Sequence, residues 1–206
     1  MDVFPEFTFD LDDFVPVRDL PVKVQRLLVT LNAPPRLVVH LALVHDAAAE
    51  LIDALQCRWP DLKTDEDAIL FGAAIHDIGK ILHTNELTGP GNKHEQDGPG
   101  LLQQHGVSPE RSRFARTHGT WKTEPNLALD DLIVALADNS WKGSRNEALE
   151  TVIAGRLAES LGIETWEAFM SVDEIVSQVA SRGEERLAWQ CRASTSTQSS
   201  TTPLEL

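Results

Sequence analysis

The feature that most constrains the fold is an apolar run with a His-Asp pair near its end, AILFGAAIHDIGKIL, residues 68–82. Residues 68–75 carry no charge, which indicates that this segment lies inside the protein. A buried carboxylate such as Asp77 is costly unless it is paired or bound to a metal, and His76 beside it is a common ligand type. Gly79 permits the chain to leave the helix. Two interpretations follow: a metal site, or a buried His-Asp hydrogen bond without metal.

Apolar residues spaced three and four apart predict helices along most of the chain, and no segment reads as a convincing strand. We therefore predict an all-α fold, organised as one helical bundle domain over residues 18–190. The central helix is expected to follow an N-cap at Thr64 and to stop near Gly79. The other predicted helices cover residues 20–31, 36–56, 100–105, 108–118, 127–141, 144–161 and 171–189.

Local signals mark several of these helix ends. Pro35 and Pro109 suit the first turn of a helix. Ser144 and Ser171, each followed three residues later by Glu, are predicted capping boxes. Residues 83–100 are rich in Gly, Pro and Asn and are expected to form one long loop, functional or disordered.

The two ends of the chain differ from the middle in composition. Residues 1–17 alternate Phe and Val with acids and prolines. We expect an ordered N-terminal arm or a short edge strand there, with a loose terminus as the alternative. Residues 191–206 are polar and low in complexity, and we expect a disordered tail.

The formal charge of −14 argues against binding to a nucleic acid polymer or an anionic membrane. It leaves a small phosphorylated substrate open, because a bound metal supplies positive charge locally. Cys57 and Cys191 form no motif, the N-terminus does not resemble a signal peptide, and no apolar run is long enough for a membrane span. A cytoplasmic protein is the expectation, and a homodimer is left open.

Six histidine and aspartate side chains stand out as metal ligands by their positions. His40 falls on the inward stripe of the second helix, where a satisfied core histidine is the more frequent explanation. His45 lies off the centre of that stripe and is expected on the surface or flank. Imidazole and carboxylate together suit iron, manganese, zinc or magnesium. The candidate ligands are His40, His76, Asp77, His94, His118 and Asp138.

The order His, His-Asp, Asp resembles the HD superfamily of metal-dependent phosphohydrolases. The matching segments are RLVVHLALVHDAAAELIDAL, AAIHDIGK, HEQDGPGLLQQHGV and LDDLIVALAD, within residues 34–145. The resemblance implies an all-α fold in which His40, the His76-Asp77 pair and Asp138 bind one metal. His94 and His118 match the additional pair of the dinuclear subgroup, in which Asp77 bridges two divalent metals, with Fe, Mn or Mg as candidates.

Within that subgroup the chain looks most like the symmetrical diadenosine tetraphosphatases. Lys80, the His118-Gly119 pair and Arg145 match their pattern, whereas NSWKGSR, residues 139–145, departs from it at Trp141 and Lys142. The expected function is hydrolysis of a nucleotide or another small phosphoester by a metal-activated hydroxide.

The resemblance also implies roles for side chains around the metals. Asp77 and Lys80 are the expected catalytic residues, since Lys80 can contact a phosphate oxygen. Lys142 and Arg145 are weaker substrate-binding candidates, with solvated surface charge as the alternative. His83 and Glu95 could support the ligands. Trp121 and Trp141 could stack a base, although buried packing is the more frequent explanation.

Two other functions remain open at this point. A branch of the same superfamily holds two irons with six such ligands and cleaves a C–C or C–P bond with dioxygen. This diiron oxygenase is the alternative to the hydrolase. A nucleotide or metal sensor without turnover is a third hypothesis, against which the complete ligand set counts.

Overall fold

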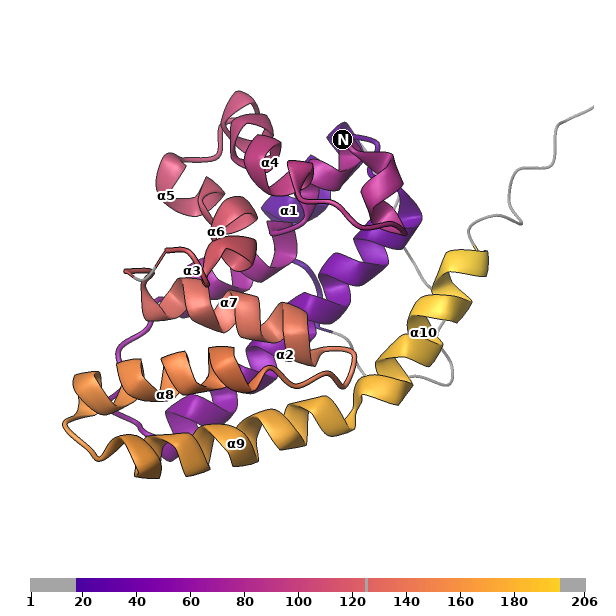
Figure 1. Cartoon of the computed structure of the whole chain (residues 1–206). Coiled ribbons are helices and arrows are strands. Elements are labelled where there is room, and N and C mark those ends of the chain that lie inside the picture. The colour runs from indigo at the N-terminus through magenta and orange to yellow at the C-terminus, as the bar shows by residue number, and fades with distance from the viewer. Residues whose placement is uncertain (1–17, 125, 197–206) are drawn as a thin grey trace, which may run out of the picture.

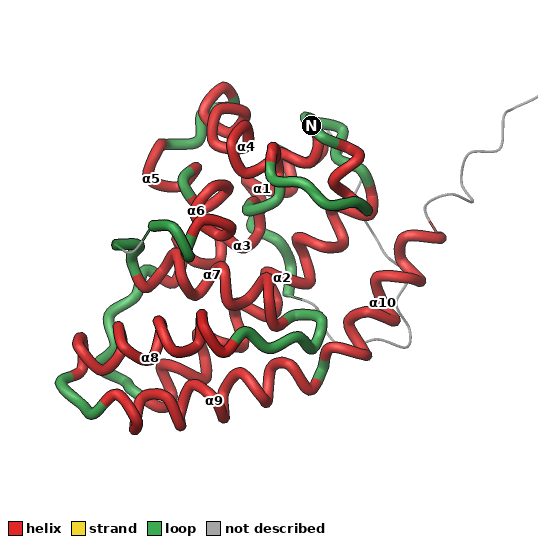
Figure 2. The backbone as a smooth tube through the Cα atoms, viewed as in Figure 1, coloured by secondary structure: helices red, strands yellow, loops and turns green. Residues whose placement is uncertain are grey.

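The structure, a computed structural model, describes residues 18–124 and 126–196, and all regular structure in this part of the chain is helical (Figures 1 and 2). The predicted all-α fold is confirmed. Two short 3-10 helices, η1 and η2, accompany the α-helices. The elements are α1 (Val22–Thr30), α2 (Pro35–Arg58), α3 (Glu66–Ile75), η1 (Ile78–Ile81), η2 (Thr84–Leu87), α4 (Lys93–Gln104), α5 (Pro109–Ser112), α6 (Phe114–Thr120), α7 (Leu129–Ser140), α8 (Glu147–Leu161), α9 (Thr165–Ser181) and α10 (Gly183–Ser196).

Helix α2 is the central element, and α3, α7, α9 and α10 all pack against it. Its sequence explains this position, because apolar residues occur on nearly every side of its middle turns and Leu41, Leu43 and Leu51 are completely buried. Helices α8 and α9 lie side by side along one edge, and α10 leaves the end of α9 at an angle (Figure 1). The other end of the bundle is built from α4, α5 and α6, which pack against η1 and α7.

A buried ion-pair cluster ties α10 to α2. Arg186 is almost completely buried and donates to Glu50 at 2.7 Å, to Asp46 at 3.5 Å and to the carbonyl oxygen of Val179 at 2.8 Å. A buried guanidinium needs such partners, because an unpaired buried charge is strongly destabilising. Asp46 also accepts from the backbone N–H of Arg18, so the same cluster holds the start of the described chain.

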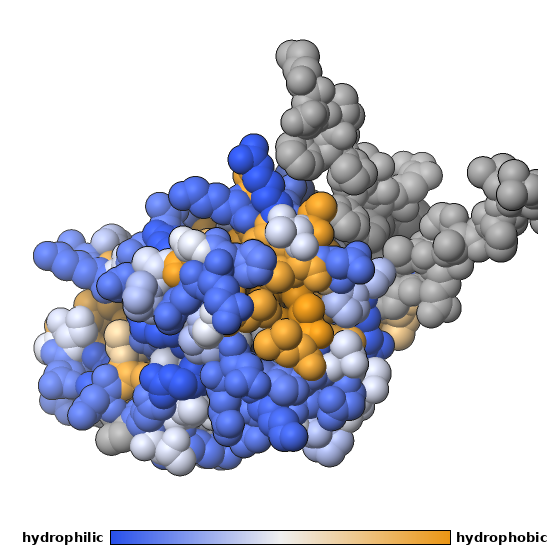
Figure 3. Space-filling model, turned by 90° about the horizontal axis from the view of Figure 1, so that it is seen from above, coloured by the Kyte–Doolittle hydropathy of each residue, from blue (hydrophilic) through white to orange (hydrophobic). Residues whose placement is uncertain are grey.

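The face shown in Figure 3 is largely hydrophilic, with an apolar area near its middle. This distribution agrees with the acidic composition of the chain. None of the helices in the described residues has the length and apolar composition that a membrane span requires.

The first half of the chain contains the helices that periodicity predicts, with one different cap. Pro35 is the first residue of α2, as expected. The central helix starts at Glu66 and its N-cap is Asp65, whose side chain accepts from the N–H of Ala68; the prediction of Thr64 was wrong. The helix ends at Ile75, before Gly79, and η1 follows it.

The prediction of one long loop over residues 83–100 is also wrong. Residues 84–87 form η2, and α4 begins at Lys93 and contains Pro99 in its interior. Pro and Gly usually mark helix ends, but packing overrides them here: the Cα of Gly98 approaches Ala115 so closely that an added Cβ would lie 3.0 Å from the Ala115 methyl. The predicted helix over 108–118 is present as two pieces, α5 and α6.

Near the C-terminus both predicted capping boxes are wrong. The cap of α8 is Asn146, whose side chain accepts from the N–H of Leu149, and the helix ends at Leu161 as predicted. Ser171 lies inside α9, and the last helix is the separate α10. Helix α10 continues to Ser196, into the segment expected as a disordered tail. The predicted N-terminal arm, residues 1–17, and the rest of the predicted tail, residues 197–206, lie outside the described residues.

Candidate metal centre

Five elements bring the six predicted ligands to one place in the bundle. His40 comes from α2, His94 from the first turn of α4, His118 from α6 and Asp138 from the last turn of α7. His76 caps the end of α3, and Asp77 follows it with φ −97° and ψ 11°. This backbone region is sparsely populated and is a frequent conformation for active-site residues.

A glycine explains how α4 reaches the end of α3. The Cα of Gly79 lies so close to α4 that an added Cβ would be 2.2 Å from the carbonyl oxygen of His94. Only glycine permits this approach, which carries His94 to Asp77. On the other side, Asp131 of α7 accepts from Arg113 at 3.0 Å and from Thr117 at 2.7 Å, and this fixes α6 and the neighbouring His118.

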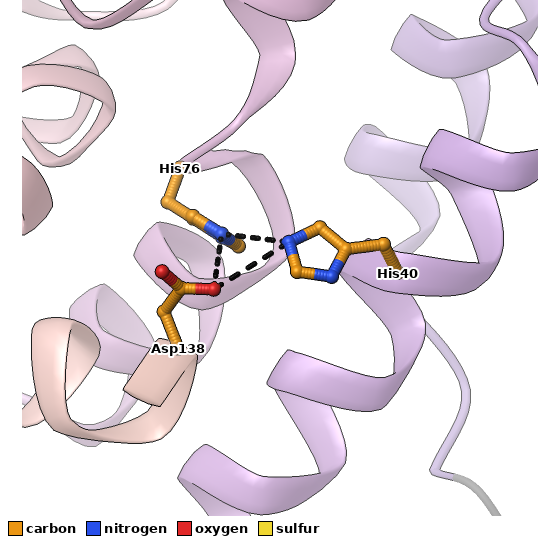
Figure 4. Close-up of side chains that lie close together, drawn as sticks. All are labelled: His40, His76 and Asp138. Carbon is orange, nitrogen blue, oxygen red and sulfur yellow. Dashed lines mark hydrogen bonds and ion pairs between the residues drawn. The ribbon is translucent and has the colours of Figure 1, made fainter. Parts of the chain in front are cut away.

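The ligand atoms form two groups of three. In the first triad, His40, His76 and Asp138, the two Nε2 atoms are 3.2 Å apart (Figure 4). Oδ1 of Asp138 lies 3.3 Å from Nε2 of His76 and 3.5 Å from Nε2 of His40. In the second triad, Asp77, His94 and His118, Oδ1 of Asp77 lies 3.0 Å from Nε2 of His94 and 3.6 Å from Nε2 of His118.

Asp77 joins the two triads because its two oxygens face different ones. Oδ1 faces the second triad, and Oδ2 lies 2.9 Å from Nε2 of His40 and 3.6 Å from Nε2 of His76. Lys80 also donates to Oδ2. The carboxylate is therefore placed to bridge two ions.

The tautomers of the ligand histidines can be deduced from their second nitrogen. Nδ1 of His76 lies 2.8 Å from the carbonyl oxygen of Ala73, and Nδ1 of His118 lies 3.1 Å from that of Phe114. A carbonyl oxygen only accepts, so each Nδ1 carries a proton and each Nε2 points into the site, where it offers a lone pair whenever the ring is neutral. Partners of this kind hold metal-bound histidines in orientation.

The donor set fits divalent metal ions. Two ligands that share one ion at about 2.1 Å lie about 3.0–3.5 Å apart, close to the spacing within each triad. Without a cation, the imidazole lone pairs and carboxylate oxygens would face one another with nothing between them except protons. Such a group of acceptors is stable when cations or protons occupy it.

The pKa values of the metal-free site show which of these side chains bind protons when no cation is present. Burial acts to lower the pKa of His76, but Asp77 and Asp138 outweigh it and raise that pKa. Burial lowers the pKa of His40 despite the nearby Asp77 carboxylate. Burial alone would raise the pKa of Asp77, yet His76 and the hydrogen bonds from His118, His40 and His94 hold it well below its usual range. Protons and metal ions therefore compete for the same lone pairs.

Exposure shows from which side the site is reached. The side chain of Asp138 is 30% exposed and that of Lys80 20%, whereas His76 is completely buried and His118 is 6% exposed. Asp138, Lys80 and His40, whose side chain is 14% exposed, therefore line the entrance, and His76 and the second triad lie deeper.

Other predicted site residues lie in different surroundings. Arg145 donates to Glu150 at 2.9 Å and to Asp173 at 2.7 Å, so its guanidinium joins α8 to α9. Lys142 is exposed, and the preceding Trp141 is buried with its ring edge-to-face on His40 at 5.2 Å between centroids. Trp121 is half-buried, with the Lys122 ammonium 5.2 Å from its ring centroid.

The residues that support the ligands were only partly anticipated. His83 pairs with Asp97 at 2.7 Å, and the Glu95 carboxylate lies against Gly119. The buried partner of His94 is Glu86, at 2.6 Å from Nδ1. No signal in the sequence singled out Glu86, because Glu95 has the same carboxylate and lies directly beside His94.

The fold and the site together define the class: an all-helical protein with a buried His/Asp centre that could hold divalent metal. The model of the HD domain family matches residues 22–140, which is more than half of the chain and includes all six candidate ligands. The chain therefore belongs to the HD domain family, whose members are generally metal-dependent phosphohydrolases and bind divalent metals. Comparison with curated proteins and with solved structures gives no match.

Proposed function

We propose that this protein hydrolyses a small phosphoester or phosphoanhydride, with two divalent metal ions held by the two triads. The observation that carries the proposal is the orientation of Asp77: each of its oxygens faces a different triad. Nucleotides of the diadenosine tetraphosphate type are the first substrates to test, because the order of the ligand residues resembles that of the symmetrical tetraphosphatases.

In this reaction water adds to phosphorus and the P–O bond to the leaving group breaks, which gives an alcohol or a phosphate and a second phosphate product. When bound, the metals supply the positive charge that lowers the pKa of water and neutralises phosphate oxygens. Because imidazoles provide four of the six ligands, iron or manganese suits the site better than magnesium, which prefers oxygen.

The residues of the chain have separate tasks in this proposal. Asp77 would hold the two ions, since each of its oxygens faces a different triad. Lys80 stands at the entrance and donates to a phosphate oxygen of the substrate in place of its present contact with Asp77. The four histidines, packed by the surrounding helices, would each direct an Nε2 lone pair at an ion. The exposed Lys142 is a further candidate to contact the substrate.

The surroundings of Arg145 support a structural role in place of the expected substrate contact. Its partner Glu150 is almost completely buried, so the ion pair is part of the packing of α8. We therefore propose Lys80, with Lys142 as second candidate, as the cations that meet the phosphate groups.

The test is a phosphate-release assay on protein stripped with chelator and reloaded with Mn²⁺ or Fe²⁺, using a panel of nucleotides and phosphomonoesters. We expect metal-dependent hydrolysis, and Asp77→Asn should fall to the background rate with an unchanged circular dichroism spectrum. Turnover that consumes one dioxygen per substrate, together with a mixed-valence iron resonance, would contradict hydrolysis and support the diiron oxygenase. Metal binding without any turnover would support the sensor.

A further inference from the structure

Glu86 is a buried carboxylate outside the two triads. It lies in η2, is 5% exposed and accepts three hydrogen bonds, all from the start of α4. The donors are the backbone N–H of Lys93 at 3.3 Å, the backbone N–H of His94 at 3.2 Å and Nδ1 of His94 at 2.6 Å. One side chain therefore contacts both the backbone and the imidazole of a ligand residue.

The backbone contacts cap helix α4. The N-cap residue by position is Asn92, whose side chain makes no capping hydrogen bond. The first N–H groups of a helix need acceptors, and a negative charge near them is favourable. Glu86 meets both needs from a segment outside the helix, so the start of α4 depends on the placement of η2.

The contact with the ring of His94 orients the second triad. Nδ1–H points to Glu86, and Nε2 points to Oδ1 of Asp77 at 3.0 Å. His76 and His118 use backbone carbonyl oxygens for the same purpose. A carboxylate partner makes the imidazole a stronger ligand than a carbonyl partner does.

The backbone of the intervening segment fits around this carboxylate. A Cβ added to Gly91 would lie 2.4 Å from Cδ and Oε1 of Glu86. Glycine at this position therefore lets the chain pass directly over the carboxylate, and a methyl group there would displace it.

We propose that Glu86 is a positioning residue that couples the folding of residues 84–94 to divalent metal binding at the second triad. The inference rests on the two-metal site proposed above. It makes the two ions unequal: the first triad is built on α2, α3 and α7, whereas the second depends on a cap supplied from η2.

Two substitutions disturb this contact by different routes. In Glu86→Gln the amide oxygen still accepts from a backbone N–H, but one of the two acceptor oxygens is replaced by a donor. Gly91→Ala leaves Glu86 in the chain and displaces its carboxylate. The matched controls are Asp97→Asn, which alters the partner of the non-ligand His83, and Gly100→Ala, where an added methyl meets open space.

The measurement is a calorimetric titration of metal-free protein with Mn²⁺. Wild type and both controls should take up two ions. In Glu86→Gln and Gly91→Ala the second ion should bind about 10- to 100-fold more weakly, with the first unchanged. Amide hydrogen exchange of the metal-free protein should show faster exchange at Lys93 and His94 in both variants.

Wild-type affinity for both ions and wild-type exchange in the two variants would overturn the role of Glu86. If wild type itself binds a single ion, the two-metal proposal fails. In that case, unchanged exchange at Lys93 and His94 would show separately that Glu86 does not cap α4.

Discussion

Oδ1 of Asp77 lies 3.0 Å from Nε2 of His94, while the other oxygen of the same carboxylate faces the first triad. This arrangement requires the end of α3 and the start of α4 to be in contact, and Gly79 permits that contact. Asp77 therefore holds a central position in the site, and substitutions on either side of it should have different effects.

The first prediction concerns metal stoichiometry. Asp77→Asn should lose both ions, because it removes charge from both triads. Asp138→Asn should weaken the first ion and His118→Gln the second, since each of these residues belongs to one triad. Metal content per chain, measured after gel filtration in chelator-free buffer, tests this. An Asp77→Asn protein that retains two ions would contradict the bridging role.

The second prediction concerns Trp141, whose ring packs on His40. Trp141→Leu should destabilise the metal-free protein by about 2–4 kcal/mol, because it leaves a cavity. It should also weaken metal binding at the first triad, since the His40 ring loses its packing partner. Denaturant unfolding and metal titration measure the two effects.

Trp59→Leu is the matched control for Trp141. Trp59 is also buried but caps the opposite end of α2. The Trp59→Leu substitution should lower the free energy of unfolding by a similar amount and leave the metal affinity unchanged. Equal losses of metal affinity in both variants would show that general destabilisation, and not the contact with His40, is responsible.

The third prediction concerns pH and His45, which was expected on the surface or flank but is 3% exposed. Burial lowers the pKa of His45 to about 4. The unfolded chain then binds a proton near pH 6.5 that the folded protein does not bind until about pH 4. The free energy of unfolding is therefore unaffected by His45 above pH 6.5. As the pH falls from 6.5 toward 4, protonation of His45 in the unfolded chain lowers that free energy by up to about 3 kcal/mol.

The measurement for His45 is denaturant unfolding in the presence of chelator at pH 7.5 and pH 5.0. His45→Leu should lose less stability between the two pH values than wild type, and replacement of the exposed His105 by Gln should behave as wild type. The same pH dependence in all three proteins would disprove the assignment.

The fourth prediction separates Arg145 from Lys142. Arg145→Met leaves the buried Glu150 without its guanidinium partner, which should cost about 3 kcal/mol of stability. Lys142→Ala removes an exposed side chain and should leave stability within about 0.5 kcal/mol. If Lys142 meets the substrate, its loss raises KM. A raised KM with unchanged stability in Arg145→Met would restore Arg145 as a substrate contact.

The sequence predicted most of the helices, and the side chains that come together in the two triads, for identifiable reasons. The apolar stripe of α2 is a periodic signal, and residues 68–75 before His76 are a continuous uncharged run. Both patterns predict burial directly. The order of the six candidate ligands carried the resemblance that brought them together. His40 could not be separated from an ordinary core histidine until α2 and α7 were placed beside each other.

What the sequence did not predict depends on tertiary contacts. Pro99 and Gly98 indicated a loop, but packing on Ala115 keeps them in α4. Ser171 has the spacing of a capping residue, but α9 begins at Thr165. Ser171 therefore lies inside the helix, where the backbone N–H groups need no cap. Glu86 acquires its role only because η2 folds over the start of α4.

The most direct test is a crystal structure of the Mn²⁺-loaded protein with anomalous diffraction at the manganese edge. We expect two anomalous peaks, one among His40, His76 and Asp138 and one between His94 and His118, with one oxygen of Asp77 on each. A single peak, or two peaks of which only one contacts Asp77, would contradict the account.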